Sequence, residues 1–458
     1  MNELESSHDV IELLGCAPAV LAALGDRARL QAMLDVEAAL ADAEAACGVI
    51  PAAAVDAIRA AARSELYDLA DLATDARRSG NLAIPLVARL TMRVAAVDSD
   101  AARYVHWGAT SQDIVDTGLV LQLARSLPSV LSDLDHAADA AARHARQHAR
   151  TVMAGRTWLQ HATPVTFGLK AAGWLDAIGR VRQSLESSRR GALVLQFGGA
   201  SGTLAALGAD GPRVMAALAE RLHLETPILP WHAERGRLAR LACELGVAVG
   251  TLGKIARDLV LLAQSEVGEA GDPATTAGGS SSMPQKRNPV RAVLVLAAAG
   301  RVPALVASML SAMPQEHERG AGGWHVEWDT LPQIVRLASV AAHSAAAALE
   351  ELIVNPAKMR ANLAISGGTV MAEAVAVRLS ASLGKADAHA VVQSVASRAT
   401  NEDRPFRDLL AENPDVMRVL SRRDLDEVLT PELYLGSAIT FVEAALAAHD
   451  AAARKRGA

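Results

Sequence analysis

Aromatic residues are scarce in this chain: Phe, Trp and Tyr together make up 3% of its 458 residues. Runs of β-branched residues are short as well, and no convincing alternation of apolar and polar residues is found. Because strands favour both residue classes and that alternation, their scarcity argues against a β-rich fold. Ala, Leu, Arg and Glu instead recur at three- and four-residue spacing, which is the helical period. The sequence therefore predicts an all-α fold.

Cysteine is nearly absent too. Cys16, Cys47 and Cys243 form no CxxC pair and lack the spacing of metal ligands. This pattern fits reduced core thiols in a cytosolic compartment. The amino terminus lacks the basic and then apolar pattern of a signal peptide, and no uninterrupted apolar run approaches membrane-spanning length. We therefore expect a cytoplasmic protein without a membrane partner.

An excess of positive charge is also missing. The formal net charge is -6, so no broad basic face for nucleic acid is expected. Gly253-Lys254-Ile255 lacks the flanking residues of a phosphate-binding loop, and no GxGxxG follows a strand. His144 and His148 share one helix face, but no HExxH glutamate accompanies them. We expect no bound cofactor and no metal ion.

Long helices dominate the expected architecture. Apolar residues at helical spacing place five of them at roughly 113–148, 164–191, 233–266, 289–313 and 328–353. The fourth of these is apolar nearly all round, as expected of a helix that is buried between subunits. We expect three helical domains, whose central long-helix bundle forms the core of a homotetramer. The predicted domains are residues 1–108, 109–365 and 366–458.

The run from Gly279 to Pro289, GSSSMPQKRNP, combines a flexible loop, a fixed cation and a helix start. Gly278 and Gly279 free the backbone, while Asn288 is a good N-cap and Pro289 suits the first helical position. Lys286 then lies just before a helix N-terminus, where unpaired N–H groups already favour negative charge. We interpret the run as a loop that closes over an anion. A solvated Ser/Gly linker is the alternative interpretation.

A second candidate segment is HWGATSQD, at residues 106–113. Ser111 can cap the helix that is expected to begin near Asp113, which leaves Thr110 and neighbouring amides for a ligand carboxylate. An ordinary serine cap explains this segment about equally well.

A third segment is GRTWLQHATP, at residues 155–164. Thr163 is placed to cap a helix whose first residue is Pro164, although this signal is weak alone. Because three separate segments place polar groups at expected helix starts, we interpret them as parts of one composite anion site.

Arg319 is a further candidate cation, in the polar stretch QEHERGAGGWHVEW at residues 315–328. A guanidinium group can hold a carboxylate through two parallel hydrogen bonds. The competing interpretation is a charged connection between two helices. The stretch WHAERGR at 231–237 could supply another cation through Arg235 or Arg237, although ion pairs that cap a helix explain it as readily.

The loop run GSSSMPQKRNP also resembles the G-S-S-x-M-P-x-K-x-N-P signature of the fumarase/aspartase superfamily, which includes fumarase, aspartase and the argininosuccinate and adenylosuccinate lyases. The resemblance extends from about Val105 to about Glu373. It implies an all-helical fold and chemistry at a carbon beside a carboxylate. In the superfamily the first serine after the loop glycine acts as base or acid, which implies Ser280 as the catalytic residue. Lys286 and Asn288 are then implied to hold that carboxylate.

The same resemblance covers the other two segments. They resemble the T-S-x-D and G-R-T-H-L-Q stretches of the superfamily, which come from different subunits and meet the serine loop of another. This implies a homotetramer with composite active sites. It also implies substrate-binding roles for residues of these segments and for the loop arginine: His106, Thr110, Ser111, Trp158, Gln160, His161 and Arg319.

Trp158 departs from the superfamily pattern, because the fumarases and the argininosuccinate and adenylosuccinate lyases carry histidine there. Loss of water or of an amine benefits from a proton-transfer group at this place, and tryptophan supplies none. Addition of an internal carboxylate needs no such help. The stretches around Trp158 and Arg319 also resemble bacterial members that form a lactone from a carboxylated muconate in aromatic catabolism. We therefore expect a cycloisomerase with a tricarboxylate substrate; an adenylosuccinate-lyase-like C–N lyase and a non-catalytic structural descendant are the alternatives.

Overall fold

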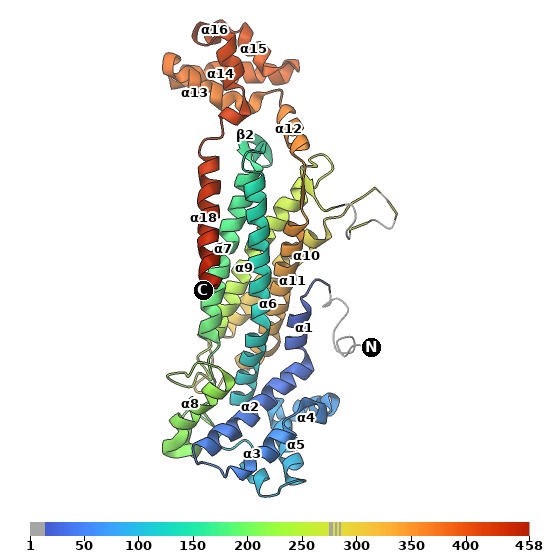
Figure 1. Cartoon of the computed structure of the whole chain (residues 1–458), viewed down its shortest axis with the longest axis vertical. Coiled ribbons are helices and arrows are strands. Elements are labelled where there is room, and N and C mark those ends of the chain that lie inside the picture. Colours follow the sequence, from blue (N-terminus) through green and yellow to red (C-terminus); the bar gives the residue numbers. More distant parts are fainter. Residues whose placement is uncertain (1–13, 274–277, 280–281, 284, 458) are drawn as a thin grey trace. The chain divides into compact units, whose positions relative to one another are not determined.

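The structure of the chain, a computed structural model, is built almost entirely of helices (Figure 1). It describes residues 14–273, 278–279, 282–283 and 285–457. The predicted all-α fold is confirmed, since the strands within these ranges amount to one hairpin and one pair of two-residue strands. The chain folds into two compact units, each assembled from separate stretches of sequence. The division into three domains stays a prediction.

The α-helices are α1 (Pro18–Leu24), α2 (Asp26–Ala46), α3 (Ala53–Ala61), α4 (Leu69–Ser79), α5 (Ala83–Ala95), α6 (Ser111–Gln147), α7 (Phe167–Ala192), α8 (Gly211–Leu222), α9 (Gly236–Leu262), α10 (Val290–Ser311), α11 (Gly323–Glu350), α12 (Pro356–Ala364), α13 (Ala372–Leu383), α14 (Lys385–Glu402), α15 (Phe406–Glu412), α16 (Pro414–Val419), α17 (Arg422–Val428) and α18 (Ala438–Gly457). The strands are β1 (Val152–Thr157), β2 (Gln160–Thr166), β3 (Ala270–Gly271) and β4 (Ile353–Val354). All five predicted long helices are present, as α6, α7, α9, α10 and α11.

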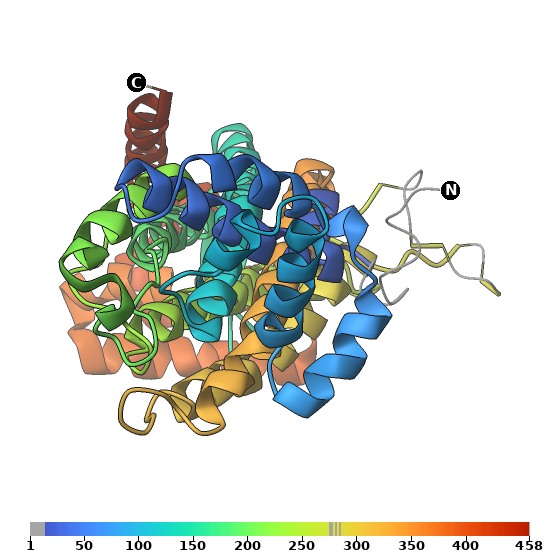
Figure 2. The same ribbon diagram turned by 90° about the horizontal axis from the view of Figure 1, so that it is seen from below.

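The first unit comprises Met1–Leu134, Val181–Gly253 and Leu294–Ser344. Its helix α2 forms because Leu30, Met33 and Leu34 recur at helical spacing and are buried on one face. The helix stops where Gly48 takes a φ of 75°, a left-handed conformation that glycine adopts without steric cost. Helix α8 (green) packs beside α2 (blue), as Figures 1 and 2 both show.

Sections of α9 and α10 approach each other closely in this unit. A Cβ atom on Gly246 would lie 3.0 Å from the Val306 side chain, and one on Gly253 would lie 2.8 Å from the Ala299 side chain. Larger residues at either glycine would push the two helices apart. The helix–helix packing therefore depends on small residues at these contacts.

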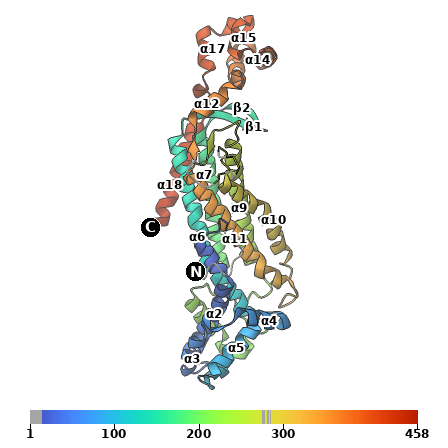
Figure 3. The ribbon, with the colours of Figure 1, turned by 90° about the vertical axis from the view of Figure 1, so that its right-hand side faces the viewer.

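The second unit comprises Asp135–Arg180, Lys254–Val293 and Ala345–Ala458. Strands β1 and β2 pair antiparallel in it as a hairpin (Figure 3). The predicted helix cap at Thr163 and helix start at Pro164 are wrong, because both residues lie in β2 and α7 begins at Phe167. Thr166 caps α7 instead, since its Oγ1 accepts a hydrogen bond of 3.0 Å from the backbone N–H of Leu169.

Helices α6 and α10 are long and apolar enough to cross a membrane, judged by length and composition alone. Charged residues interrupt both helices, as Arg291 and Arg301 do in α10, so neither is the uninterrupted apolar run that the sequence was expected to lack. The protein buries 72% of the apolar window of α6 but only 22% of that of α10. Helix α10 thus presents an apolar surface that the described residues of a single chain leave largely uncovered.

The carboxyl-terminal helices α13 to α17 enclose a small core of their own. Phe406, Leu409 and Leu410 of α15 are fully buried there, against Val375 and Leu379 of α13. All the buried residues of this core lie between Val375 and Leu425. Replacement of one of its buried side chains therefore tests the stability of this part of the chain.

The substitution Phe406→Ala should lower the free energy of unfolding by about 3–5 kcal/mol, because it removes a buried ring and leaves a cavity. Phe441→Ala is the matched control, since that ring is 60% exposed and its loss should cost less than about 1 kcal/mol. Urea unfolding followed by circular dichroism measures both changes. Equal losses in the two variants would contradict the role assigned to this core.

Candidate functional site

The first predicted segment lies at the start of α6, in the first unit. Ser111 is the first helical residue, so it does not cap the helix as predicted. Thr110 precedes the helix instead. Its backbone N–H donates to the Asp113 carboxylate at 3.0 Å, and its carbonyl oxygen accepts from the backbone N–H of Asp113 at 3.0 Å. This reciprocal pair fixes Thr110 through its backbone and leaves its hydroxyl for other contacts.

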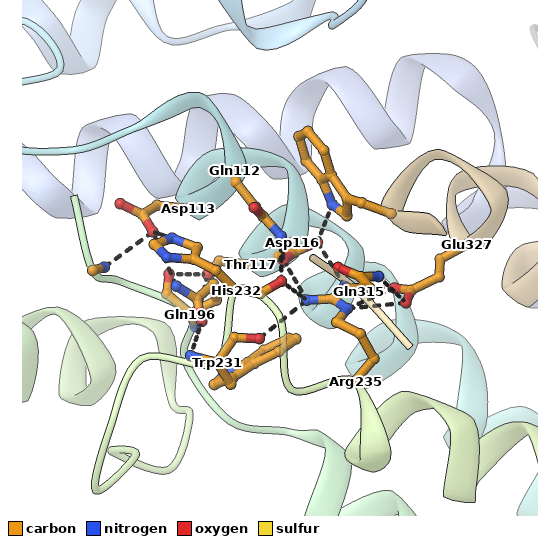
Figure 4. Close-up of polar contacts among 12 residues, drawn as sticks. Gln112, Asp113, Asp116, Thr117, Gln196, Trp231, His232, Arg235, Gln315 and Glu327 are labelled. Atoms are coloured by element: carbon orange, nitrogen blue, oxygen red, sulfur yellow. Dashed lines mark hydrogen bonds and ion pairs between the residues drawn. The ribbon is translucent and has the colours of Figure 1, made fainter. Parts of the chain in front are cut away.

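Asp113 connects this helix start to two loops (Figure 4). It is fully buried, and its Oδ1 lies 2.7 Å from Nε2 of His232 and accepts a hydrogen bond of 3.1 Å from Gln196. The backbone N–H groups of Gly198 and Gly199 donate to the same carboxylate at 3.0 and 2.9 Å. These hydrogen bonds replace the ones that the carboxylate would form with water, and so offset the cost of burying its charge. The two loops are therefore fixed to the first turn of α6.

Asp116 repeats this arrangement one turn along α6 (Figure 4). Arg235 donates to Asp116 at 2.7 and 3.1 Å and, through Nε, to Glu327 of α11 at 2.9 Å. All three side chains are 1% exposed. Trp324 donates a further hydrogen bond of 2.8 Å to Asp116, and the guanidinium lies 4.8 Å from the ring centre of Trp231. Burial raises the pKa of Glu327, and the ion pair with Arg235 opposes that shift.

Arg319 meets Thr110 although 209 residues separate them. Its Nη2 donates to the Thr110 hydroxyl at 3.2 Å and to the carbonyl oxygen of Ala200 at 3.1 Å. Its Nε is buried and has no partner among the described residues. The structure thus brings together two residues that the sequence assigned to the substrate, and part of the guanidinium is available to a ligand.

His106 belongs to the same segment as Thr110. Its Nδ1 lies 2.6 Å from Oε1 of Glu37, and its φ of 60° is uncommon for a residue with a side chain. Burial lowers the pKa of His106, but the Glu37 carboxylate and Asp113 raise it, and the net shift is upward. The first unit therefore holds a histidine whose charged form is favoured.

The second predicted segment forms the turn of the β1–β2 hairpin, in the second unit. Trp158 and Leu159 have φ values of 52° and 64°, in the left-handed region that bulky residues rarely adopt. Such conformations cost roughly 1–3 kcal/mol each and persist where the surroundings hold them. The two side chains are 97% and 73% exposed. The rest of the described chain therefore does not hold this turn through side-chain packing.

Arg156 anchors the hairpin below that turn. Its two terminal nitrogens donate to the two oxygens of Glu269 at 2.8 and 2.7 Å, and Asn362 donates to Glu269 at 2.7 Å. Glu269 is fully buried and directly precedes β3, from which the serine-rich loop departs. Burial, together with the charge of Arg156, lowers the pKa of the neighbouring His161. The hairpin and the stem of the loop therefore share one fixed frame.

Ser280, the predicted catalytic residue, lies outside the described residues. Lys286 is exposed and Asn288 is partly buried. The backbone N–H of Asn288 donates to the Gly278 carbonyl oxygen at 2.8 Å, and a Cβ on Gly278 would come within 2.3 Å of the Asn288 oxygen. Only glycine fits this closed end of the loop. Helix α10 begins one residue later than predicted, after Pro289.

The predicted site residues divide between the two units. The first unit holds His106, Thr110, Ser111 and Arg319. The second unit holds Trp158, Gln160, His161, Lys286 and Asn288. Each unit thus carries part of the predicted site.

The sequence did not reveal the buried network around Asp113 and Asp116. The sequence allows Arg235 to be a ligand cation or part of a helix-capping ion pair. Its contacts with Asp116 and Glu327 leave it no free face for a ligand carboxylate. A signal was present in the sequence, since two aspartates three residues apart lie on an otherwise apolar stretch of α6. Acidic residues on a buried helix face need partners.

Glu44 is another buried acid, on α2. It is fully buried, and neither of its carboxyl oxygens has a hydrogen-bond partner in the described part of the chain. Burial, reinforced by the charge of Glu37, raises its pKa to about 9. Glu44 is therefore neutral at pH 7, whereas it is ionised in the unfolded chain.

The substitution Glu44→Gln should stabilise the protein at pH 7 by up to about 3 kcal/mol and flatten its pH dependence. The folded state holds a proton that the unfolded state loses above about pH 4.5, so the stability of the parent protein falls between that pH and about pH 9. Urea unfolding at pH 5 and pH 8 measures the difference. The exposed Glu443→Gln is the control; parallel pH curves for Glu44→Gln and the parent would show that Glu44 is not held neutral.

Two models of protein families match the chain. The model described as "Lyase" matches residues 12–304, and the model described as "Adenylosuccinate lyase C-terminus" matches residues 368–445.

Individual relatives match nearly the whole chain. A 3-carboxy-cis,cis-muconate cycloisomerase of Pseudomonas aeruginosa is 52% identical, over 94% of this chain and 94% of the relative. A nitrosuccinate lyase of Streptomyces davaonensis is 42% identical, over 96% and 94%. The solved structure of the 3-carboxy-cis,cis-muconate lactonizing enzyme from Pseudomonas putida is similar with a TM-score of 0.92 and 48% identity, over 97% of this chain and 99% of that one.

Proposed function

Because the chain belongs to the lyase family whose model it matches over residues 12–304, we propose that it converts 3-carboxy-cis,cis-muconate to 4-carboxymuconolactone. The similarity to a cycloisomerase over 94% of both chains carries this proposal. Trp158 supports it, because an apolar ring stands where water- or amine-eliminating members have a proton-transfer histidine. The reaction is a step of protocatechuate catabolism, in the β-ketoadipate pathway.

The reaction is an isomerisation, so it needs no second reactant. An oxygen of one terminal carboxylate forms a bond to the double-bond carbon that bears the extra carboxyl group. The π bond breaks, and its electron pair takes up a proton on the adjacent carbon, beside the other terminal carboxylate. Negative charge accumulates on that carboxylate before the proton arrives, so fixed cations and N–H donors must lie around it. The internal carboxylate is already close to its target, which lowers the entropic cost.

Each predicted site residue has a place in this scheme. Ser280 exchanges the proton, and Lys286 and Asn288 hold the carboxylate next to the carbon that receives it. Arg319 and Thr110 hold a second carboxylate. Their mutual hydrogen bond, and the Nε of Arg319 that has no partner among the described residues, support this assignment. His106, Ser111, Gln160 and His161 complete the contacts with the substrate, and Trp158 excludes water.

We further propose that these segments meet between copies of the chain, in a homotetramer in the cytoplasm. Two surfaces support this proposal. The apolar window of α10 is only 22% buried in one chain, and an apolar helix of this kind is stable in water when another helix covers it. The turn at Trp158 and Leu159 is exposed and lacks packing partners among the described residues, and a second copy would supply them.

A C–N lyase is the second candidate function. The match of residues 368–445 to an adenylosuccinate lyase C-terminus and the similarity to a nitrosuccinate lyase favour it. Both reactions develop charge on a carboxylate, as the proposed lactonisation does, so the same loop and cations could serve them. The two functions differ in the leaving group, because a C–N lyase releases an amine or nitrite and the lactonisation releases nothing.

The purified protein, dialysed against a chelator and without nucleotide, should cyclise 3-carboxy-cis,cis-muconate, measured by the loss of ultraviolet absorbance. Its kcat/KM for cis,cis-muconate should be at least about 100-fold lower, because that substrate leaves a site cation without its carboxylate. Adenylosuccinate and nitrosuccinate serve as parallel substrates and should not be cleaved. Comparable kcat/KM values for the two muconates, or efficient release of an amine or nitrite, would overturn the proposal.

The variants Ser280→Ala and Thr110→Val should each be nearly inactive, and a mixture of the two should regain activity after subunit exchange. If each site takes the serine loop and the Thr110 segment from different chains, about a quarter of the sites in an equal mixture are intact. Sedimentation should give a tetramer, and native mass spectrometry should confirm the exchange. Differently tagged Ser280→Ala preparations mixed with each other are the control; no gain after confirmed exchange would contradict composite sites.

A further inference from the structure

Glu37 is a buried carboxylate with a single hydrogen-bond partner among the described residues. It lies in α2 among buried apolar residues and is 1% exposed. Its Oε1 is 2.6 Å from Nδ1 of His106, whereas its Oε2 is buried without a partner among the described residues. Such a half-satisfied carboxylate costs stability, because the oxygen without a partner has lost its water. A purely structural contact would be better served by a neutral residue.

The charged and titratable groups around the pair are few. His106 faces Glu37 and, at longer range, Asp113 at the start of α6. Glu37 also faces Tyr67 and Glu44. Burial raises the pKa of Tyr67 to about 12, and that of Glu44 is raised to about 9, so both are neutral at pH 7.

Arg93, a cation that lies beside Tyr67, has other contacts. Arg93 lies 5.0 Å from the ring centre of Tyr67, and it donates to the carbonyl oxygen of Leu66. It forms no ion pair with Glu37 in the described part of the chain. The charge of Glu37 is therefore balanced by His106.

We propose that Glu37 is a positioning residue that keeps His106 in its imidazolium form, so that the Nε2–H of His106 donates to a carboxylate of the substrate. This inference rests on the proposed function. The bond to Glu37 occupies Nδ1 and leaves Nε2 without a partner among the residues described. The His106 side chain is 18% exposed, on the segment that also carries Thr110.

The charge on His106 depends on Glu37 because burial acts against it. Burial alone favours the neutral imidazole, and the carboxylate reverses that preference. A lysine or arginine would be charged without such a partner. A histidine and glutamate pair instead supplies a short, rigid donor whose ring orientation is fixed by one hydrogen bond. A tricarboxylate then meets two donors in the first unit, His106 and Arg319.

The test is the pH profile of kcat/KM for Glu37→Gln, which keeps the shape of the side chain and removes its charge. His106 must be protonated, so activity falls as pH rises through its pKa. The variant lowers that pKa, and its alkaline limb should move down by about one pH unit or more. The loss of kcat/KM should therefore be small near pH 5.5 and exceed about tenfold near pH 8. A loss that is equal at every pH would show a merely structural role and overturn the proposal.

Glu44→Gln is the matched control. Glu44 lies two turns further along the same helix and is equally buried, but it is already neutral below its pKa of about 9. The control should therefore leave the alkaline limb unchanged between pH 5.5 and pH 8. A limb that moves as far as in Glu37→Gln would overturn the specific role of Glu37.

A second measurement uses the parent protein alone, so it depends neither on a substrate nor on the folding of a variant. Exchange of the histidine C2 hydrogen for deuterium, followed by mass spectrometry of the parent protein, reports the pKa of each histidine. His106 should titrate above the ordinary histidine pKa, measured in parallel on a short unstructured peptide that contains histidine. A His106 that titrates below the peptide histidine overturns the proposal. If His106 titrates high but no muconate is turned over, the proposed function fails and the Glu37 pair stands.

Discussion

The buried carboxylates of α6 are the constraint on which the first unit depends. Asp113 and Asp116 accept hydrogen bonds from groups that lie about 80 to 210 residues further along the chain, and both are out of contact with water. Because each oxygen must find donors, the loop at Gly198, the loop at His232 and the start of α11 can take only positions that supply them. The positions of Thr110 and Arg319 therefore depend on this network.

The second unit also contains a buried carboxylate that binds donors from separate elements. Glu269 is buried, and Arg156 and Asn362 satisfy it from different elements. Asp113, Asp116 and Glu269 are thus all paired, whereas cations of the predicted site, Lys286 and Arg319, keep donors without protein partners in the described chain. The protein thereby fixes its framework with negative charge and leaves positive charge for a ligand. Such an arrangement suits a polyanionic substrate.

The sequence alone predicts the long helices but does not predict the contacts between them. The long helices could be predicted because apolar residues at helical spacing are a local signal. The hairpin was missed, since Thr163-Pro164 also suits a helix start and the strand is short. Pairs such as His106 with Glu37, 69 residues apart, or Arg319 with Thr110 leave no local pattern. Only the fold of the chain decides which partner a buried polar group finds.

The choice of reaction must depend on a limited set of residues, because a relative named for lactone formation and one named for release of another group are each more than two-fifths identical to this chain. In the proposed scheme the loop cations and the donors at the start of α6 stabilise charge on a carboxylate, and that need is the same whichever bond breaks or forms. The reactions then differ in the nucleophile or leaving group at the neighbouring carbon. The turn at Trp158 is suited to select the internal carboxylate as nucleophile, since a large ring at its tip can exclude water without donating a proton. Under that condition the internal carboxylate adds to the double bond without competition from water.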